Sequence, residues 1–214
     1  MAHEPISTRP PDPVERRVLE AFVTAECSAL LRRHRFEDFL RLRTLADHHQ
    51  HAVTEARLGH LTAARAQLRA LDRQCPRDEE LALVYRLTAG PTWALVEWKA
   101  GDLVRARAHM NGTLHAAARL AAYFGHDYLT AHRIYLATNL ARVEASAVRL
   151  HLAAERVEAL RAVADGTRDR WPHTGAGTLQ VPLTGDEALL VSDRLNLLAA
   201  SIATALRAAT GSKP

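Results

Sequence analysis

The chain has 214 residues and a formal net charge of +4, and 48% of its residues are hydrophobic against 24% that are charged. This length supports one domain with a sizeable core, and the composition excludes an intrinsically disordered chain. No run approaches 18 consecutive apolar residues, so the sequence predicts no membrane span.

Among the 28 basic residues only Lys99 and Lys213 are lysines, a bias that is typical of proteins from GC-rich bacterial genomes. The arginines are spread along the chain, whereas nucleic-acid binders concentrate basic charge on one face, so nucleic-acid binding is disfavoured. The two cysteines, Cys27 and Cys75, have no CxxC spacing. We expect them to be buried, reduced thiols in a cytoplasmic protein.

Helical periodicity accounts for most of the chain. Residues 1–11 are polar and proline-rich, which predicts a flexible arm without a signal peptide, and 12–214 are expected to form one all-helical domain. There is no proline from 92 to 170. The expected helices run, in chain order, over about 13–35, 36–58, 61–74, 79–100, 103–124, 127–165 and 186–209.

Turn and capping residues divide these helices. Asp78 and Asp102 are predicted N-caps, and Gly90-Pro91 predicts a kink or a short break in the fourth helix. Residues 127–165 contain neither Gly nor Pro and form one long helix or two. Average helix length favours a break near Glu144, with Ser146 as the cap of the second segment.

The last part of the domain combines an irregular stretch with a capping helix. Residues 166–185 are rich in Gly, Pro and Thr, which predicts a loop. Thr184 and Glu187 have the spacing of a capping box, which launches the final helix at 186–209.

The interior turns repeat. Leu58–Arg65 parallels Ala100–Arg107, and Val143–Arg149 is a weaker third copy without the glycine. The spacing is about 42 residues and each unit is helix, turn, helix, so the chain divides into units at 36–77, 78–125 and 126–165. Such units cannot bury an apolar face alone and must stack on their neighbours.

The first unit has small Ala52 in its first helix, Gly59 at the turn, Ala64 at the helix crossing, Leu68 behind it and Pro76 at the exit. In these features it resembles a tetratricopeptide repeat, and a weaker likeness extends over about 36–165. The resemblance implies a right-handed array of antiparallel hairpins with a concave groove that binds a peptide or a partner protein. The alternative is a compact all-α bundle of the same seven or eight helices.

Polar and aromatic side chains gather on the first helices of the middle units, where they could line a groove or pocket for a partner or ligand. The predicted lining comprises Arg86, Trp93, Glu97, Trp98, His132, Tyr135 and Asn139.

Catalytic and metal motifs are weaker. The helical serines lack a Gly-x-Ser-x-Gly elbow, there is no HExxH, and no catalytic residue is predicted. Asp47 and His51 are four residues apart and could share one metal ion, but solvated side chains explain them better, so neither metal nor cofactor is expected. Arginines from Arg32 to Arg43, interleaved with Phe36 and Phe39, form the one candidate phosphate-binding cluster.

Three functions are compatible with these observations. The leading prediction is a non-catalytic helical-repeat protein that binds a protein partner, such as an enzyme that it stabilises, and that forms homo- or hetero-oligomers. The second is a small-molecule binder or helical-bundle enzyme with a pocket between the middle helices and Trp171 in a lid. The third is a weak nucleic-acid binder.

Overall fold

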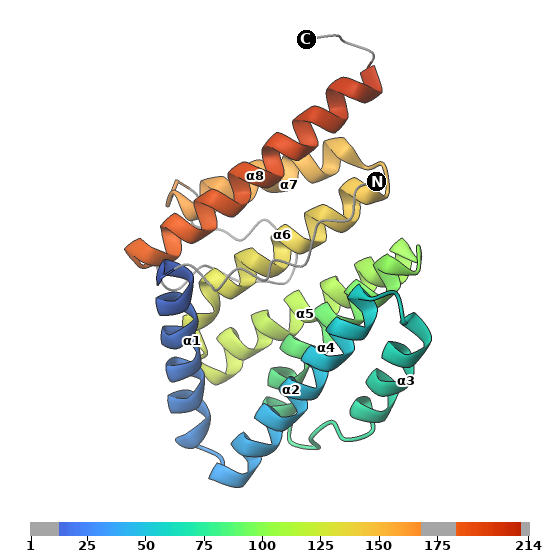
Figure 1. Ribbon diagram of the computed structural model, residues 1–214. Helices are drawn as coiled ribbons and strands as arrows, with labels where there is room; N and C mark the ends of the chain where they lie inside the picture. The colour runs from blue at the N-terminus through green and yellow to red at the C-terminus, as the bar shows by residue number, and fades with distance from the viewer. Residues whose placement is uncertain (1–12, 168–182, 211–214) are drawn as a thin grey trace.

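The computed structural model describes residues 13–167 and 183–210, and this part of the chain is helical without any strand (Figure 1). The prediction of an all-α fold is confirmed. The elements are α1 (Pro13–Leu31), α2 (Phe36–Arg57), α3 (Leu61–Asp72), α4 (Glu79–Lys99), α5 (Leu103–Phe124), the 3-10 turn η1 (Asp127–Leu129), α6 (Thr130–Ser146), α7 (Leu150–Ala164) and α8 (Gly185–Thr210).

Side-chain caps begin three of the helices as predicted. The Asp78 carboxylate accepts a hydrogen bond from the Leu81 amide at 3.0 Å, and Asp102 caps α5 in the same way. Before α8, the Thr184 amide donates to the Glu187 carboxylate at 2.8 Å and the Glu187 amide donates to the Thr184 hydroxyl. These bonds satisfy amides that lack a partner within the first helical turn.

The sequence predicted a kink or a short break at Gly90 and Pro91, and the break is wrong, because α4 is continuous through both residues. Gly90 lies against Thr113 and the His109 carbonyl of α5, so there is no room for a side chain at this crossing. Tertiary packing of α4 on α5 therefore overrides the local signal, and the glycine serves close approach of two helices instead of a turn.

The 127–165 segment forms two helices, with the break at residues 147–149. The position agrees with the prediction, but Ser146 does not cap the second helix. Its hydroxyl donates to the Arg142 carbonyl and accepts from the Trp98 indole at 3.0 Å. The chain turns instead at Val148, whose φ of 59° is left-handed.

Several predictions fall outside the described residues. These are the arm at 1–11 and most of the loop at 166–185, including Trp171. The described end of that loop shows Gly166 with a left-handed φ of 70° after α7.

The helices pair as hairpins that stack in chain order. The pairs are α2 with α3, α4 with α5, and α6 with α7, and α8 packs on both α6 and α7. Helix α2 contacts α4, and α5 contacts α6. Helices α4 and α6 are the first helices of the next two hairpins, as α2 and α4 are of the first two. Unlike α2 and α4, they are not among the packed helix pairs of the described chain.

The three hairpin turns share one geometry. Gly59, Gly101 and Val148 are each left-handed, with φ of 89°, 81° and 59°. In every case the next amide donates to the carbonyl four residues before the left-handed residue, as His60 to Glu55, Asp102 to Glu97 and Arg149 to Glu144. The third turn is thus centred on Val148, four residues later than the sequence alignment placed it.

The same register sets the contacts between hairpins. Each turn lies between two buried alanines that are twelve residues apart in the sequence. The pairs are Ala52 and Ala64, Ala94 and Ala106, and Ala141 and Ala153. Arg65 of the first hairpin pairs with Glu97 of the second at 2.6 Å. Arg107 of the second pairs with buried Glu144 of the third at 3.5 Å.

Helix α1 does not join this stack. It runs along one edge of the array, at the left of Figure 1, and contacts α2, η1 and α8. Arg17 near its start is bonded to Asp186 of α8 at 2.7 Å. Helix α1 therefore covers the edge at which α2 and α8 begin.

Helix α8 is apolar enough to qualify, by length and composition, as a membrane span over Gly185–Ala209, with a mean hydropathy of 1.4. This is a weak indication, because a helix that packs against a protein core meets the same criterion. One face of α8 packs in this way, through Val191, Leu195, Leu198 and Ile202. The absence of a membrane span stays a prediction.

Candidate functional site

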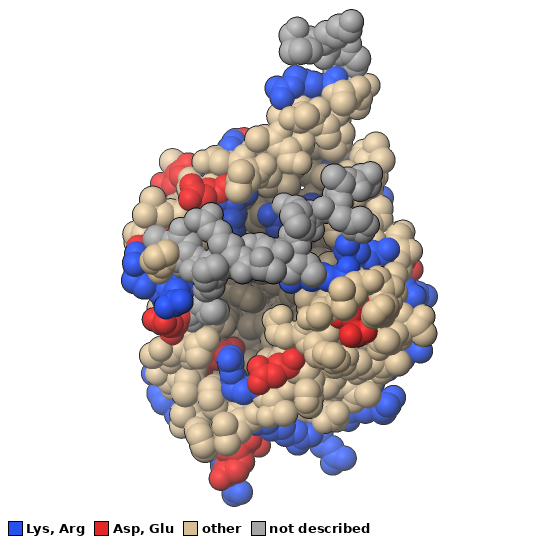
Figure 2. Space-filling view, in the orientation of Figure 1, with Lys and Arg blue, Asp and Glu red and all other residues tan. Residues whose placement is uncertain are grey.

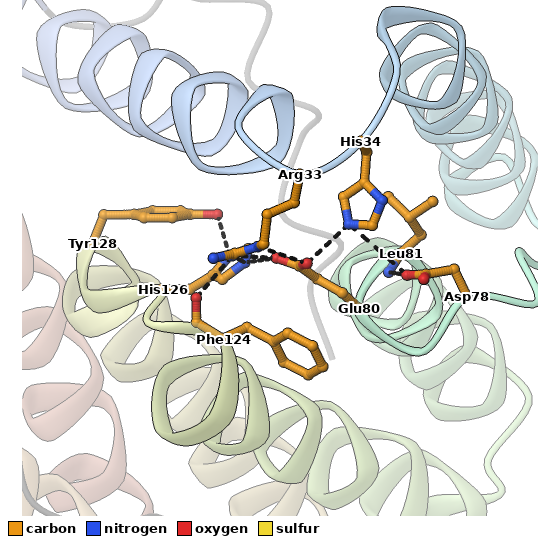
Figure 3. A network of polar contacts seen from close by, with 8 residues as sticks. All are labelled: Arg33, His34, Asp78, Glu80, Leu81, Phe124, His126 and Tyr128. Carbon is orange, nitrogen blue, oxygen red and sulfur yellow. Dashed lines mark hydrogen bonds and ion pairs between the residues drawn. The ribbon is translucent and has the colours of Figure 1, made fainter.

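Two groups of polar side chains include residues that are buried or partly buried. One surrounds Glu80 and comprises Arg33, His34, Glu80, His126 and Tyr128, which we call the Glu80 cluster (Figure 3). The other lines a cavity beneath α1. The polar groups of the Glu80 cluster are hydrogen-bonded to one another, which is typical of a structural site. Those of the cavity are not, so the cavity is the candidate binding site.

The Glu80 cluster ties three segments together. The Glu80 carboxylate, only 3% exposed, accepts two bonds from the Arg33 guanidinium and is 2.8 Å from Nε2 of His34 and 2.6 Å from Nε2 of His126. Arg33 also donates to the Phe124 carbonyl, and Nδ1 of His126 lies 2.8 Å from the Tyr128 hydroxyl. The α1–α2 connection and the α5–η1 turn are thereby fixed to the start of α4.

These bonds determine the charge of the Glu80 cluster. Burial acts to raise the pKa of Glu80, but the hydrogen bonds from Arg33, His126 and His34 outweigh it and lower the pKa to about 2. Burial lowers the pKa of His126, in opposition to its bond with Glu80. The carboxylate is thus ionised and saturated with donors, which suits a cross-link between segments better than a site for substrate.

The cavity beneath α1, which we call the α1 cavity, has a volume of about 90 Å³. Four helices line it, so residues far apart in the sequence meet there. The lining residues are Phe22, Glu26 and Leu30 of α1, Phe39, Leu42, Arg43 and Ala46 of α2, Val84, Tyr85, Leu87 and Thr88 of α4, and His132 of α6.

Four ionisable side chains line this largely apolar space, Glu26, Arg43, Tyr85 and His132, and the Tyr85 hydroxyl donates to Asp72 at 2.9 Å. Glu26 and Arg43 carry opposite charges, yet no hydrogen bond or ion pair within 4.0 Å joins them to each other or to another residue in the described part of the chain. Burial raises the pKa of Glu26, and the charge of Arg43 acts to lower it. The pair is close enough to interact through space and too far apart to bond directly.

His132 forms another part of the wall. Its ring lies 5.1 Å from the ring of Phe22, and its buried Nε2 has no hydrogen-bond partner among the described residues. Burial lowers the pKa of His132 to about 4, so the imidazole is neutral at physiological pH. The cavity thus holds a carboxyl group and a guanidinium group beside a neutral ring.

Of the seven residues predicted to line a groove, His132 alone lines the α1 cavity. Trp93 donates to Asp72 at 3.0 Å and stacks on His109, Trp98 bonds to Ser146, and Glu97 is buried against Arg65. These contacts serve packing between hairpins. The other three lie on the surface or partly exposed, as Arg86, Tyr135 beneath the Arg194 guanidinium, and Asn139 bonded to Arg142.

The other residues singled out in the sequence are the candidate metal ligands, the two cysteines and the basic side chains. Asp47 and His51 are both exposed, and in the described ranges no three His, Cys, Asp or Glu side chains are placed to hold a metal ion. Both cysteines are free and partly buried. On the face shown in Figure 2, basic side chains are dispersed among acidic and uncharged ones instead of forming one patch.

The basic cluster after α1 is divided among structural tasks. Arg33 and His34 bind Glu80, Arg41 donates to the Gln74 carbonyl at 3.1 Å, and Arg43 lines the α1 cavity. Phe36 is 55% exposed and stacks on Phe39. Arg33, His34 and Arg41 therefore already have partners within the protein.

Sequence reasoning missed Phe22 and Glu26 and assigned Arg43 to a phosphate-binding cluster, although the sequence carries a signal for the cavity. Phe22, Glu26 and Leu30 are spaced four apart on α1, so Glu26 interrupts an otherwise apolar stripe. Arg43 does the same between Phe39 and Ala46 on α2. A lone charge on a buried stripe of a helix indicates a cavity or a bound counter-charge.

No protein-family model, curated protein or solved structure matches the chain.

Proposed function

We propose that the protein is a non-catalytic binding protein whose helical array holds a small ligand in the α1 cavity. One observation supports this above the others: Glu26 and Arg43 line the same cavity without bonding to each other. Glu26 and Arg43 are both partly buried. Withdrawing a charge from water without a partner is costly, and natural proteins retain such groups mostly where a ligand or mechanism uses them.

The architecture supports binding in a second way. Helix α1 crosses the array at one edge and covers the cavity, so a ligand would contact α1, α2, α4 and α6 at once. A ligand at this place would stabilise the position of α1 over the array. Mostly apolar walls with a few polar groups are typical of small-molecule sites.

A melting-temperature screen with small polar compounds tests the proposal. A true ligand raises the melting temperature of the wild-type protein, because it binds only the folded state. The rise should disappear in Glu26→Gln and persist in the control Glu20→Gln, which removes an exposed carboxylate from the same helix. A screen in which nothing raises the melting temperature, or one whose hits act equally on Glu26→Gln, contradicts the proposal.

A protein partner is the second candidate, on a different surface. Leu189 and Leu197 of α8 are 61% and 72% exposed, and α8 is the last described helix of the stack. In stacked arrays each hairpin buries its neighbour, so the outer face of a terminal helix is available for a further helix from another chain.

Co-purification from the native host, compared across variants, tests this candidate. A partner that docks on α8 should be recovered with wild-type protein and lost with Leu197→Glu. The control Leu58→Glu places the same charge at a position that is 57% exposed in the turn before α3. Equal recovery with all three proteins would exclude α8 as the docking face.

A further inference from the structure

We infer that the α1 cavity accepts a small zwitterion, with its ammonium group at Glu26 and its carboxylate at Arg43. The inference rests on the ligand-binding function proposed above and specifies the chemistry of the ligand. A molecule that spans the space between the two side chains, and presents a cation to one and an anion to the other, satisfies both of them.

The volume limits the ligand to a few heavy atoms. Drug-sized molecules occupy pockets of roughly 300–1,000 Å³, and a cavity of about 150 Å³ accommodates benzene. The α1 cavity, at about 90 Å³, is smaller than either. The smallest amino acids have the required size and carry both charges.

The walls favour paired charges. Apolar side chains from three helices, including Phe22, Leu42 and Leu87, surround the charged groups and reduce contact with water. Burial already disfavours the ionised form of Glu26, and an ammonium group would offset this cost. An ion pair is also stronger where water is excluded, provided that both charges are matched.

His132 is compatible with a bound cation because its ring is neutral. With a pKa of about 4 it carries no positive charge at physiological pH, so it would not repel an ammonium group at Glu26. Arg43 is then the cation that lines the same cavity. The arrangement distinguishes the two ends of a zwitterion.

Two anchors should also discriminate against molecules with one charge. An amine without a carboxylate leaves Arg43 unmatched, and a carboxylate without an amine leaves Glu26 unmatched. Sites that leave a buried polar group unpaired reject such analogues strongly. We expect glycine and alanine to bind at least tenfold more tightly than ethylamine or acetate.

Titration of isotopically labelled full-length protein, followed by two-dimensional NMR, measures these affinities. Glycine, L-alanine, ethylamine and acetate are added separately, and the expected shifts lie at residues that line the α1 cavity. Glu26→Gln and Arg43→Gln should each weaken glycine binding at least tenfold. The controls Glu20→Gln and Arg57→Gln remove exposed charges from the same two helices and should leave binding unchanged.

The outcomes separate this inference from the function on which it rests. If ethylamine or acetate binds as tightly as glycine, or if only compounds of another class shift the cavity residues, the zwitterion is wrong and ligand binding stands. If no small molecule shifts them, the cavity holds water only and both proposals fail. The comparison of probes uses wild-type protein, so it is decisive even if a variant folds poorly.

Discussion

His49 on α2 is fully buried, and neither of its ring nitrogens has a hydrogen-bond partner in the described chain. Its ring packs 5.3 Å from that of Tyr85. Burial lowers the pKa of His49 to about 4, so the folded protein keeps this imidazole neutral at pH values where an unfolded chain would protonate it. A single side chain thereby makes folding sensitive to mild acid.

The sign of this effect gives the first prediction. The stability that depends on neutral His49 is complete above pH 6.5 and is lost as the pH falls toward 4. In this pH range the imidazole is protonated in the unfolded chain but stays neutral in the folded protein. His49→Met should therefore lose roughly 2 kcal/mol less unfolding free energy than wild type between pH 7.5 and 4.5. Urea unfolding at both pH values measures it.

The control for His49 is His51→Met, which makes the same change at an exposed position of the same helix. It should retain the wild-type dependence on pH. His132 has a similarly lowered pKa but is present in all three proteins, so its contribution cancels. Identical pH profiles for wild type and His49→Met would contradict the prediction.

Glu80 leads to a second prediction at the residue scale. Glu80→Gln leaves Arg33 and two histidines without their carboxylate, and breaking a buried, multiply bonded pair typically costs about 3 kcal/mol. Urea unfolding at pH 7.5 should show a loss of this size. Glu79→Gln, an exposed neighbour bonded to Arg119, should change the free energy by less than about 1 kcal/mol.

Glu80 should also affect acid stability in a lower pH range than His49. Because its pKa is lowered to about 2, the stability from ionised Glu80 is present above its ordinary value near 4.5 and is lost as the pH falls toward 2. Wild type should lose more unfolding free energy than Glu80→Gln across that window. Equal losses would show that the cluster contributes nothing through charge.

At the scale of helices, the sequence was a good guide wherever the signal was local. The caps at Asp78 and Asp102 and the glycine turns at Gly59 and Gly101 depend on backbone geometry that a few adjacent residues specify. The turn at Val148 could not be predicted in this way. Valine rarely adopts a positive φ, so this backbone conformation depends on the packing of the surrounding hairpin.

Gly90 gives the prediction that belongs to helix packing. A methyl group there would overlap Thr113 of α5, so Gly90→Ala should destabilise the protein by about 2 kcal/mol despite the better helix propensity of alanine. Gly112→Ala is the matched control, since Gly112 is also inside a helix and faces open space. It should stabilise by up to about 1 kcal/mol.

Thr113→Ala provides the decisive test of the mechanism. If the Gly90 effect is a clash with the threonine, the Gly90→Ala/Thr113→Ala protein should be more stable than the sum of the single changes predicts. Unfolding free energies from urea titration give the coupling. Additive values would place the cost elsewhere.

The α1 cavity could not be predicted from the sequence, because it depends on how the helices pack in the whole molecule. Glu26 and Arg43 lie on different helices, and only the crossing of α1 over α2 brings both to one cavity. Each charge stands out on its own helix, but their meeting depends on where α1 docks. Two of the predicted groove residues, Trp93 and Trp98, bond to side chains of neighbouring hairpins, Asp72 and Ser146, which the sequence could not indicate.

The docking of α1 yields a prediction about motion. Helix α1 packs on α2, η1 and α8 but not within a hairpin, whereas α4 is packed between α2, α3 and α5. The contact of α1 with its neighbours is much less extensive than that of α4, and sparsely packed segments open more easily than the core. In hydrogen-exchange mass spectrometry, amides of Phe22–Leu30 should exchange at least tenfold faster than those of Leu81–Leu87 in α4.

A compound that binds the α1 cavity should slow this exchange in α1 and leave α3 unchanged, because no residue of α3 lines the cavity. Equal exchange of α1 and α4, with the same dependence on denaturant, would show that α1 opens only with the whole protein.

The unequal spacing of the three hairpin turns is related to the position of the α1 cavity in the stack. Gly59 and Gly101 are 42 residues apart, whereas Gly101 and Val148 are 47 apart. The longer interval contains η1, and across it α4 and α6 lose the close packing that relates α2 to α4. His132 of α6 and Thr88 of α4 both line the α1 cavity, together with residues of α1. The five additional residues between the second and third turns thus coincide with the place where the stack of helices leaves room for the α1 cavity.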